Sequence, residues 1–252
     1  YLLAGWSGSN RSSPTSSSCG IRYARSVELS FGLARGKALD VDGVGIEMRS
    51  LPSPDNGLID PRSWFEDPSK PLEIEIGSGK GTFLLQEAKQ RPEVNYLGFE
   101  WAGEFYRYAA DRIRRNHLTN VKVVYGDATE FLKFWCEEQI ADVIHLYFSD
   151  PWPKKRHHKR RVIQDDALMS FHRVLSQGGE VRVVTDHDEL WQWCVEHFER
   201  HTACFSQQAF GIVESADKGE LVGSNFERKY RKEGRPFHAT TLVRMNKCNA
   251  RE

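Results

Sequence analysis

The sequence has no hydrophobic run long enough to span a membrane. A transmembrane helix needs roughly 20 consecutive apolar residues, and no stretch of the 252 residues approaches that length. Hydrophobic residues make up 39% of the chain and charged residues 28%, which is typical of a globular protein that folds in water. We therefore expect no membrane partner.

Cysteine is scarce, and its pattern excludes two kinds of site. The chain has 5 cysteines, an odd number without a C-x-x-C pair, at Cys19, Cys136, Cys194, Cys204 and Cys248. Neither a disulfide framework nor a zinc site is expected from this spacing. Free cysteines suit a reducing compartment, so we expect a cytoplasmic protein.

The chain also lacks net charge, and its first 27 residues lack acidic side chains. Lys plus Arg and Asp plus Glu both number 35, so only local clusters can indicate a polyanionic partner. Residues 1–27 are rich in Ser, contain three Arg, and lack the longer apolar core of a secretory signal. We expect a disordered tail or an upstream extension of the reading frame. The alternative is a transit peptide, which would make the protein organellar.

From about residue 71, short apolar runs alternate with longer amphipathic ones. This alternation predicts right-handed crossovers and a doubly wound, mostly parallel α/β sheet with helices on both faces. We expect residues 1–57 to form an N-terminal extension and residues 58–252 to form one domain. Residues 28–70 are expected to be an irregular lead-in. The expected strands are 72–77, 94–100, 121–127, 142–148, 180–186, 205–210 and 236–245. The expected helices are 81–90, 103–116, 129–140, one ending near Gln177 before a Gly178-Gly179 turn, and 189–199.

A glycine-rich loop, GSGKGT, follows the first of these strands. A phosphate-binding loop would need a glycine six positions before Lys80, and that position is Ile74. A dinucleotide-binding loop would read G-x-G-x-x-G, whereas Gly77, Gly79 and Gly81 are spaced G-x-G-x-G. A nucleotide kinase is thereby excluded, and a different cofactor is indicated.

Three acidic residues lie at the ends of successive expected strands. Glu75, two positions before Gly77, would repel a pyrophosphate but attract the ammonium and sulfonium of S-adenosylmethionine. Glu100 closes the second strand, where an acid commonly binds ribose hydroxyls, and Asp127 follows the third, within reach of an adenine amino group. The glycines permit a tight turn and close backbone approach. Each acid alone would be an ordinary solvated residue, but three at one sheet edge favour a site for S-adenosylmethionine.

The loop SDPWPKKRHHKRR after the fourth strand indicates the substrate. Six Lys and Arg side chains oppose the single Asp150, giving residues 150–161 a net charge of +5. A charge run is most often a solvated surface, but this one starts at the expected active edge, beside the aromatic Trp152. A basic strip next to a rigid aromatic turn suits a nucleic-acid backbone with a base turned toward the site. His157 and His158 have no third ligand nearby, and we expect no metal.

Four motifs, EIGSGKG, GFE, GDA and above all DPWPKKRHHKRR, resemble the tRNA (guanine-N7)-methyltransferases, the TrmB family. The resemblance runs from about residue 58 to the C-terminus. It implies a Rossmann-like class I methyltransferase fold with an antiparallel C-terminal strand, tRNA as the partner, and a monomer or homodimer. It also implies methyl transfer from S-adenosylmethionine to N7 of a guanine in the variable loop, position 46. The first 57 residues match no pattern.

The resemblance assigns roles to residues of this chain. Asp150 matches the catalytic aspartate, which also lies at the cofactor. The cofactor-binding positions match Glu75, Gly77, Gly79, Glu100 and Asp127, and the substrate-binding positions match Lys154 and Asp186. A T-x-[FY]-E motif that closes over the guanine appears here as Ser224, Asn225, Phe226 and Glu227. Serine keeps the hydroxyl of the family's threonine, so the role of the motif is expected to survive.

Two other functions remain open from the residues alone. The D-P-W turn superficially resembles the D-P-P-[FY] turn of enzymes that methylate amino groups of bases. A non-catalytic RNA-binding module would keep the basic loop without needing the cofactor. The intact glycine loop and its acids argue against the second reading, and the basic strip with the SNFE motif argues against the first. Guanine N7 carries a lone pair, so catalysis is expected to rest on alignment and electrostatics, with no strong general base.

Overall fold

The structure is a computed structural model that describes residues 38–246 and residue 248. The tail expected over residues 1–27 lies outside the described residues. Within the described ranges, every helix falls short of the length or the hydropathy that crossing a bilayer requires.

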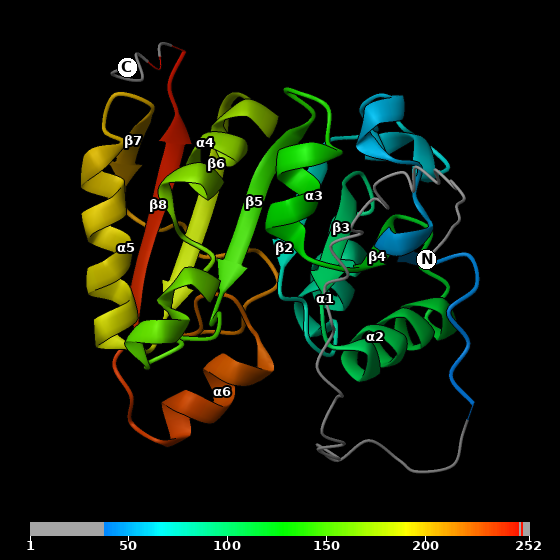
Figure 1. Cartoon of the computed structure of the whole chain (residues 1–252). Helices are drawn as coiled ribbons and strands as arrows, with labels where there is room; N and C mark the ends of the chain where they lie inside the picture. Colours follow the sequence, from blue (N-terminus) through cyan, green and yellow to red (C-terminus); the bar gives the residue numbers. More distant parts are fainter. Residues whose placement is uncertain (1–37, 247, 249–252) are drawn as a thin grey trace, which may run out of the picture. The chain divides into compact units, whose positions relative to one another are not determined.

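A single eight-stranded sheet organises the described residues, in the order β1-β4-β3-β2-β5-β6-β8-β7 (Figure 1). Every pairing is parallel except those of β8, which runs antiparallel to both β6 and β7. The predicted mostly parallel sheet with an antiparallel C-terminal strand is confirmed. The strands are β1 Gly45–Glu47, β2 Leu72–Ile76, β3 Asn95–Glu100, β4 Val121–Tyr125, β5 Ala141–Tyr147, β6 Leu175–Thr185, β7 Phe205–Gln208 and β8 His238–Arg244.

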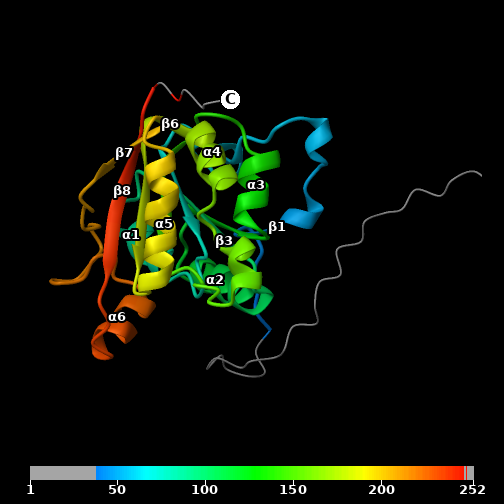
Figure 2. The same cartoon turned by 60° about the vertical axis from the view of Figure 1, so that its left-hand side comes forward.

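Helices cover both faces of the sheet, as predicted. Figure 2 shows α3, α4 and α5 side by side on one face, where Phe131, Phe171 and Phe198 join the largest buried cluster. On the other face, Leu84 of α1 and Tyr106 of α2 join a second cluster. The helices are α1 Thr82–Gln90, α2 Gly103–Arg115, α3 Ala128–Phe134, α4 Asp165–Val174, α5 Asp188–Arg200 and α6 Asn225–Lys232.

The apolar character of the central strands follows from this double covering. Successive side chains of a strand point to opposite faces, so Tyr96 of β3 enters the second cluster while Leu97 enters the first. Because both faces are buried, both sets of side chains must be apolar or internally paired. Helix α2 shows the complementary pattern: one side, with Ala109 and Ile113, is buried, whereas Arg107 and Arg115 are exposed.

Two expected helix ends were wrong. The helix expected to reach residue 140 ends at Phe134, because Cys136 already bridges to Ile59 in extended conformation. Helix α4 ends at Val174, not near Gln177, and Leu175 begins β6 by pairing with Ala141. The Gly178-Gly179 pair therefore does not close a helix. It lies within β6 where the register shifts, and Gly178 takes the positive φ of 73° that an irregular strand position requires.

The segment expected to be an irregular lead-in contributes a strand to the sheet. β1 pairs with β4 at the sheet edge, with Gly45 opposite Val123. Val44 and Met48 on either side of β1 are buried. Short 3-10 helices follow at Met48–Ser50, Pro54–Asn56 and Pro61–Trp64. β1 has only three residues, which is too short for an alternating pattern, so the sequence did not predict this strand.

The expectation of free cysteines was wrong for one pair. Cys204, just before β7, is disulfide-bonded to Cys248. Cys136 and Cys194 are free and buried, and burial raises the pKa of each thiol to about 12. The sequence separation of 44 residues hid the disulfide, because only the antiparallel pairing of β7 with β8 brings the two positions together.

Candidate active site

The glycine loop lies where β2 ends and α1 begins. The backbone N–H groups of Gly77 and Ser78 both donate to the carbonyl of Phe99, at 2.9 Å, which holds the loop against β3. Gly77, Gly79 and Gly81 have φ angles of 81°, 53° and 64°, values that favour glycine. A Cβ added at Gly77 would meet nothing within 4 Å, so the loop leaves open space on that side. The loop can therefore take a ligand against its backbone.

Glu75 presents a buried carboxylate beneath this loop. Glu75 is 6% exposed, and its Oε2 atom has no hydrogen-bond partner. Burial, together with the nearby Glu100 and Glu87, raises the pKa of the Glu75 carboxyl to about 8. An orphaned buried carboxylate of this kind is stabilised by a cationic ligand group. The residues present therefore fit the ammonium of S-adenosylmethionine.

The other two predicted acids have backbone partners. The Glu100 carboxylate accepts from the N–H of Gly79 at 2.7 Å and of Ala102 at 2.8 Å, so it braces the glycine loop from β3. Burial raises its pKa, although these two hydrogen bonds act in the opposite direction. Asp127 is exposed and caps α3, accepting from the N–H of Thr129 at 2.8 Å. Both acids lie at carboxyl ends of strands, as the sequence predicted.

The turn after β5 carries Asp150 in a constrained backbone. Phe148 and Trp152 flank it with φ angles of 53° and 43°, which non-glycine residues rarely adopt. Such conformations persist only where the surroundings enforce them, and they concentrate at functional sites. Asp150 is exposed as a residue, but partial desolvation of its carboxylate raises its pKa above the ordinary value of 3.8.

The basic loop that follows is not uniform. Its 3-10 helix, Lys155–Arg160, presents exposed cations, and the guanidinium of Arg160 lies 4.8 Å from the centroid of the Trp152 ring. Arg161 differs, because its side chain is only 1% exposed. Of the six cations counted in this loop, Arg161 alone is therefore buried. The five exposed cations are Lys154, Lys155, Arg156, Lys159 and Arg160.

Helix α6, which was not predicted, places the SNFE motif beyond the carboxyl ends of β5 and β6 (Figure 1). Ser224 caps α6, its hydroxyl accepting from the N–H of Glu227 at 3.1 Å. The Asn225 amide donates to the Thr82 hydroxyl of α1 at 2.8 Å. Phe226 is 46% exposed, and its ring would lie 3.8 Å from a Cβ at Gly79. The motif thus lies against the glycine loop.

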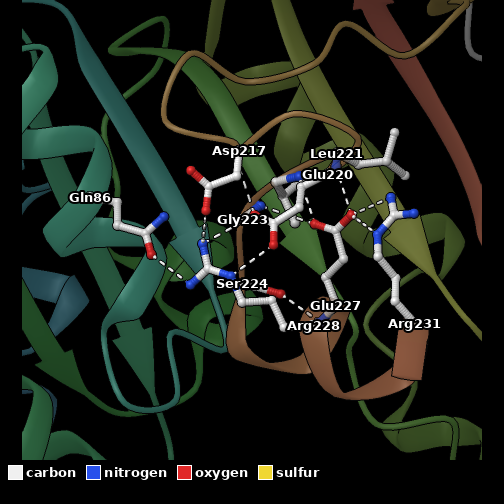
Figure 3. A network of polar contacts seen from close by, with 10 residues as sticks. Gln86, Asp217, Glu220, Leu221, Gly223, Ser224, Glu227, Arg228 and Arg231 are labelled. Carbon is white, nitrogen blue, oxygen red and sulfur yellow. Dashed lines mark hydrogen bonds and ion pairs between the residues drawn. The ribbon is translucent and has the colours of Figure 1, made fainter. Parts of the chain in front are cut away.

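Glu227, the last residue of the motif, is fully engaged within the protein. Figure 3 shows its carboxylate among the backbone of the preceding loop and Arg231. It accepts from the N–H groups of Leu221, Val222 and Gly223 at 2.6 to 3.0 Å, and Arg231 donates to it at 2.6 Å. Its exposed fraction is 0%. In this conformation the carboxylate shapes the loop before α6, and both of its oxygens already accept hydrogen bonds from within the protein.

Asp186 lies at the end of β6, next to the same elements. Its carboxylate pairs with Arg235 at 2.6 Å. The Arg235 guanidinium also lies 4.1 Å from the centroid of the Tyr230 ring. Tyr230 in turn contacts Phe148 and Phe226. Asp186, α6 and the turn before Asp150 thus form one continuous group of contacts.

Two surface hollows of the described residues lie away from this edge. One is lined by α3, α4 and Arg244 of β8, and the other by residues at the amino ends of β2, β5 and β6. Neither contains a predicted site residue. Among residues 38–246 and 248, no group of three or more His, Cys, Asp or Glu side chains could hold a metal.

Fold and sequence motifs together define a Rossmann-like methyltransferase. A family model described as "Putative methyltransferase" matches residues 69–240. The solved structure of the aminoglycoside resistance methyltransferase NpmB1 shares the fold, with a TM-score of 0.50 at 19% identity over 75% of this chain and 95% of that chain. The class is therefore that of enzymes that use S-adenosylmethionine as methyl donor.

Relatives with greater sequence identity identify the family within this class. The tRNA (guanine-N(7)-)-methyltransferase of Streptococcus mutans is 32% identical over 67% of this chain and 79% of its own length. That of Rhodopirellula baltica is 37% identical over 56% of this chain and 59% of its own length. The chain belongs to the tRNA (guanine-N7)-methyltransferase family.

Proposed function

We propose that the protein transfers the methyl group of S-adenosylmethionine to N7 of guanine 46 in the variable loop of tRNA. The observation that carries the proposal is the meeting of three features at one sheet edge. The orphaned carboxylate of Glu75, the Asp150 turn with its basic loop, and the tip of α6 all lie at the carboxyl ends of β2, β5 and β6. Open α/β sheets bind ligands at this edge.

The cofactor side is assigned to the glycine loop and its acids. When bound, S-adenosylmethionine supplies an electrophilic methyl group on a positively charged sulfur. Glu75 holds the cationic end, Gly77 and Gly79 allow backbone contact, and Glu100 fixes the loop through the Gly79 N–H. Asp127 at the start of α3 completes this side.

The substrate side is assigned to Asp150, Asp186 and the motif of α6. Asp150 orients the guanine and stabilises the positive charge that develops on it, because N7 attacks through its own lone pair and needs no base. Phe226, exposed beside Gly79, provides an aromatic face for the base. Asp186 contributes to substrate binding from the end of β6. Glu227 contributes indirectly, by holding the loop that carries Ser224 and Asn225.

The exposed cations of the basic loop bind the tRNA backbone. Lys154 directly precedes the 3-10 helix after the Asp150 turn, and the cations within that helix are exposed. Phosphate contacts of this kind position the substrate without reading its sequence. The loop therefore holds tRNA while the turn presents Asp150 to the base.

One assay tests the proposal directly. Unmodified tRNA is incubated with the protein and methyl-labelled S-adenosylmethionine, and the labelled nucleoside is identified after digestion. We expect 7-methylguanosine from tRNA carrying guanine 46, and none from a matched tRNA with adenine at that position. Label in a methylated amino group would support the alternative reading of the D-P-W turn. Label in 7-methylguanosine from both tRNAs would contradict the proposal that guanine 46 is the only methylated position.

A further inference from the structure

Arg161 closes the basic loop with its side chain turned inward. Its Nε donates to the carbonyl oxygen of Pro151 at 2.9 Å, and its Nη2 donates to Glu189 Oε1 at 2.7 Å. The guanidinium also lies 5.1 Å from the ring centroid of Trp193. A single side chain therefore connects the residue after Asp150 to two residues of α5.

Neighbouring contacts hold the same end of the loop. The Gln164 amide donates to the carbonyl oxygens of Lys159 and Arg161, at 2.8 and 3.0 Å. The Trp193 indole donates to the carbonyl of Ile163 at 2.7 Å. These contacts fix the position from which Arg161 reaches back across ten residues to Pro151.

The charge distribution separates Arg161 from the other cations of the loop. Its side chain is 1% exposed, and its counter-ion is Glu189, whose side chain is 54% exposed. The adjacent Arg guanidinium holds the pKa of the Glu189 carboxyl below its ordinary value. Because its side chain is 1% exposed, the Arg161 guanidinium would have to move toward the surface before it could contact a phosphate.

We propose that Arg161 and Glu189 form a clamp that positions Asp150 for methyl transfer, and that Arg161 takes no part in binding the tRNA backbone. The clamp holds the carbonyl of Pro151, the residue that follows Asp150 in the chain. Alignment is the main source of catalysis here, and a displacement of about 1 Å can cost on the order of a hundredfold in rate. The proposal rests on the proposed function, because the reaction provides its readout.

Glu189→Ala gives the sharpest test, because it separates an effect on tRNA affinity from an effect on turnover. Removing an acidic group beside the basic loop should strengthen or leave unchanged the affinity for tRNA. Loss of the clamp should nevertheless lower kcat by roughly tenfold to a hundredfold. Arg161→Lys keeps the charge but cannot bridge both acceptors, so we expect a similar fall in kcat. In both variants the tRNA Kd should stay within about threefold, with an unchanged dependence on salt.

The double variant tests whether the two residues act as one unit. If they do, Arg161→Lys combined with Glu189→Ala should lower kcat little further than either single change. Arg200→Gln is the matched control, because Arg200 of α5 is also paired with an acid, Asp165 of α4, but on the surface. It should keep wild-type kcat. Rates are expressed per folded protein, counted by cofactor titration.

Hydrogen exchange tests the clamp independently of activity. Backbone amides of residues 152–161 should exchange faster in Glu189→Ala and Arg161→Lys than in the wild type or Arg200→Gln. If the wild type makes no 7-methylguanosine but this difference is seen, the proposed function fails and the clamp stands. Wild-type kcat in Arg161→Lys, or weakened tRNA binding with a flatter salt dependence, would overturn the proposal.

Discussion

At the scale of single residues, Glu75 and Glu100 show how the same type of side chain can serve different purposes at one sheet edge. Glu100 is satisfied by two backbone N–H groups, so its carboxylate belongs to the architecture of the loop. Glu75 keeps an unpaired oxygen in a buried position. A charge without a partner in such a place is costly, and the cost is removed when a cation binds.

The affinity for the cofactor should depend on pH through Glu75. Folding raises the pKa of its carboxyl from 4.5 to about 8, so the cofactor-free folded state binds this proton more tightly than the unfolded chain. The free energy of unfolding should therefore fall as pH rises between these two values. Cofactor binding favours the ionised form, so calorimetry should show affinity rising by up to about tenfold per unit between pH 6 and 7.5.

The Glu75→Gln variant is the control for this pH dependence. It should bind S-adenosylmethionine weakly at every pH, with most of the dependence removed. An equally steep dependence in that variant would assign the titration to another group.

Asp150 should be needed for turnover but little needed for cofactor binding. Asp150→Ala leaves the glycine loop and Glu75 intact, because none of the hydrogen bonds that hold that loop involves Asp150. We expect turnover to be abolished while the cofactor Kd changes by less than about tenfold, or 1.4 kcal/mol. Methyl transfer to tRNA and calorimetric titration measure the two quantities. Substantial activity in Asp150→Ala would remove Asp150 from the mechanism.

At the scale of elements, the basic loop should bind tRNA through its exposed members. Lys154→Ala removes one phosphate contact, so tRNA affinity should fall and the slope of log K against log salt should decrease by about 1. Filter binding over a range of salt concentrations measures both. Lys133→Ala, which removes an exposed cation paired with Asp166 on another surface, is the control and should leave the slope unchanged.

The loop before α6 should depend on Glu227 for its shape. Glu227→Ala leaves two buried and one partly buried backbone N–H groups without their acceptor, so we expect the free energy of unfolding to fall by roughly 2 to 4 kcal/mol. The effect should appear in thermal unfolding and as faster proteolysis within residues 213–231. Glu233→Ala removes a partly exposed carboxylate from the end of the same helix and should change stability by less than about 1 kcal/mol. Equal stability of both variants would show that Glu227 does not hold this loop.

At the scale of the whole molecule, the sheet continues upstream of the domain boundary predicted at residue 58. β1 covers the edge of β4, and Val44 and Met48 are 5% and 9% exposed. We propose that the folded domain begins near residue 38. The boundary at residue 58 would leave the β4 edge open, and exposed edges favour aggregation.

Truncation tests this boundary. A chain of residues 58–252 should be less stable than one of residues 38–252 by about 3 kcal/mol or more, since two buried apolar side chains are lost. Chemical denaturation of both chains measures the difference. The longer chain should match the full sequence. If residues 58–252 unfold at the same denaturant concentration, β1 contributes nothing to stability.

Much of the fold could be predicted because central parallel strands and the helices between them have distinct periodicities. The short elements could not be predicted: β1 has three residues, and α6 has few buried side chains. The end of α4 was misplaced because Gly178 and Gly179 indicate a turn, whereas pairing with β5 places them inside a strand. Tertiary pairing outweighed a local preference at that point.

The sequence by itself determined the motifs and the order in which they meet the sheet edge, because the alternation of strands and helices brings the carboxyl ends of the parallel strands to one side. It thereby determined the cofactor class from Glu75 and its glycines, and the substrate class from DPWPKKRHHKRR. Only the tertiary structure decided which charges are free to act. Arg161 and Glu227 read as members of basic and substrate motifs, yet both are buried and paired within the protein. Their partners are backbone groups, Glu189 and Arg231, and backbone hydrogen bonds leave no trace in a sequence pattern.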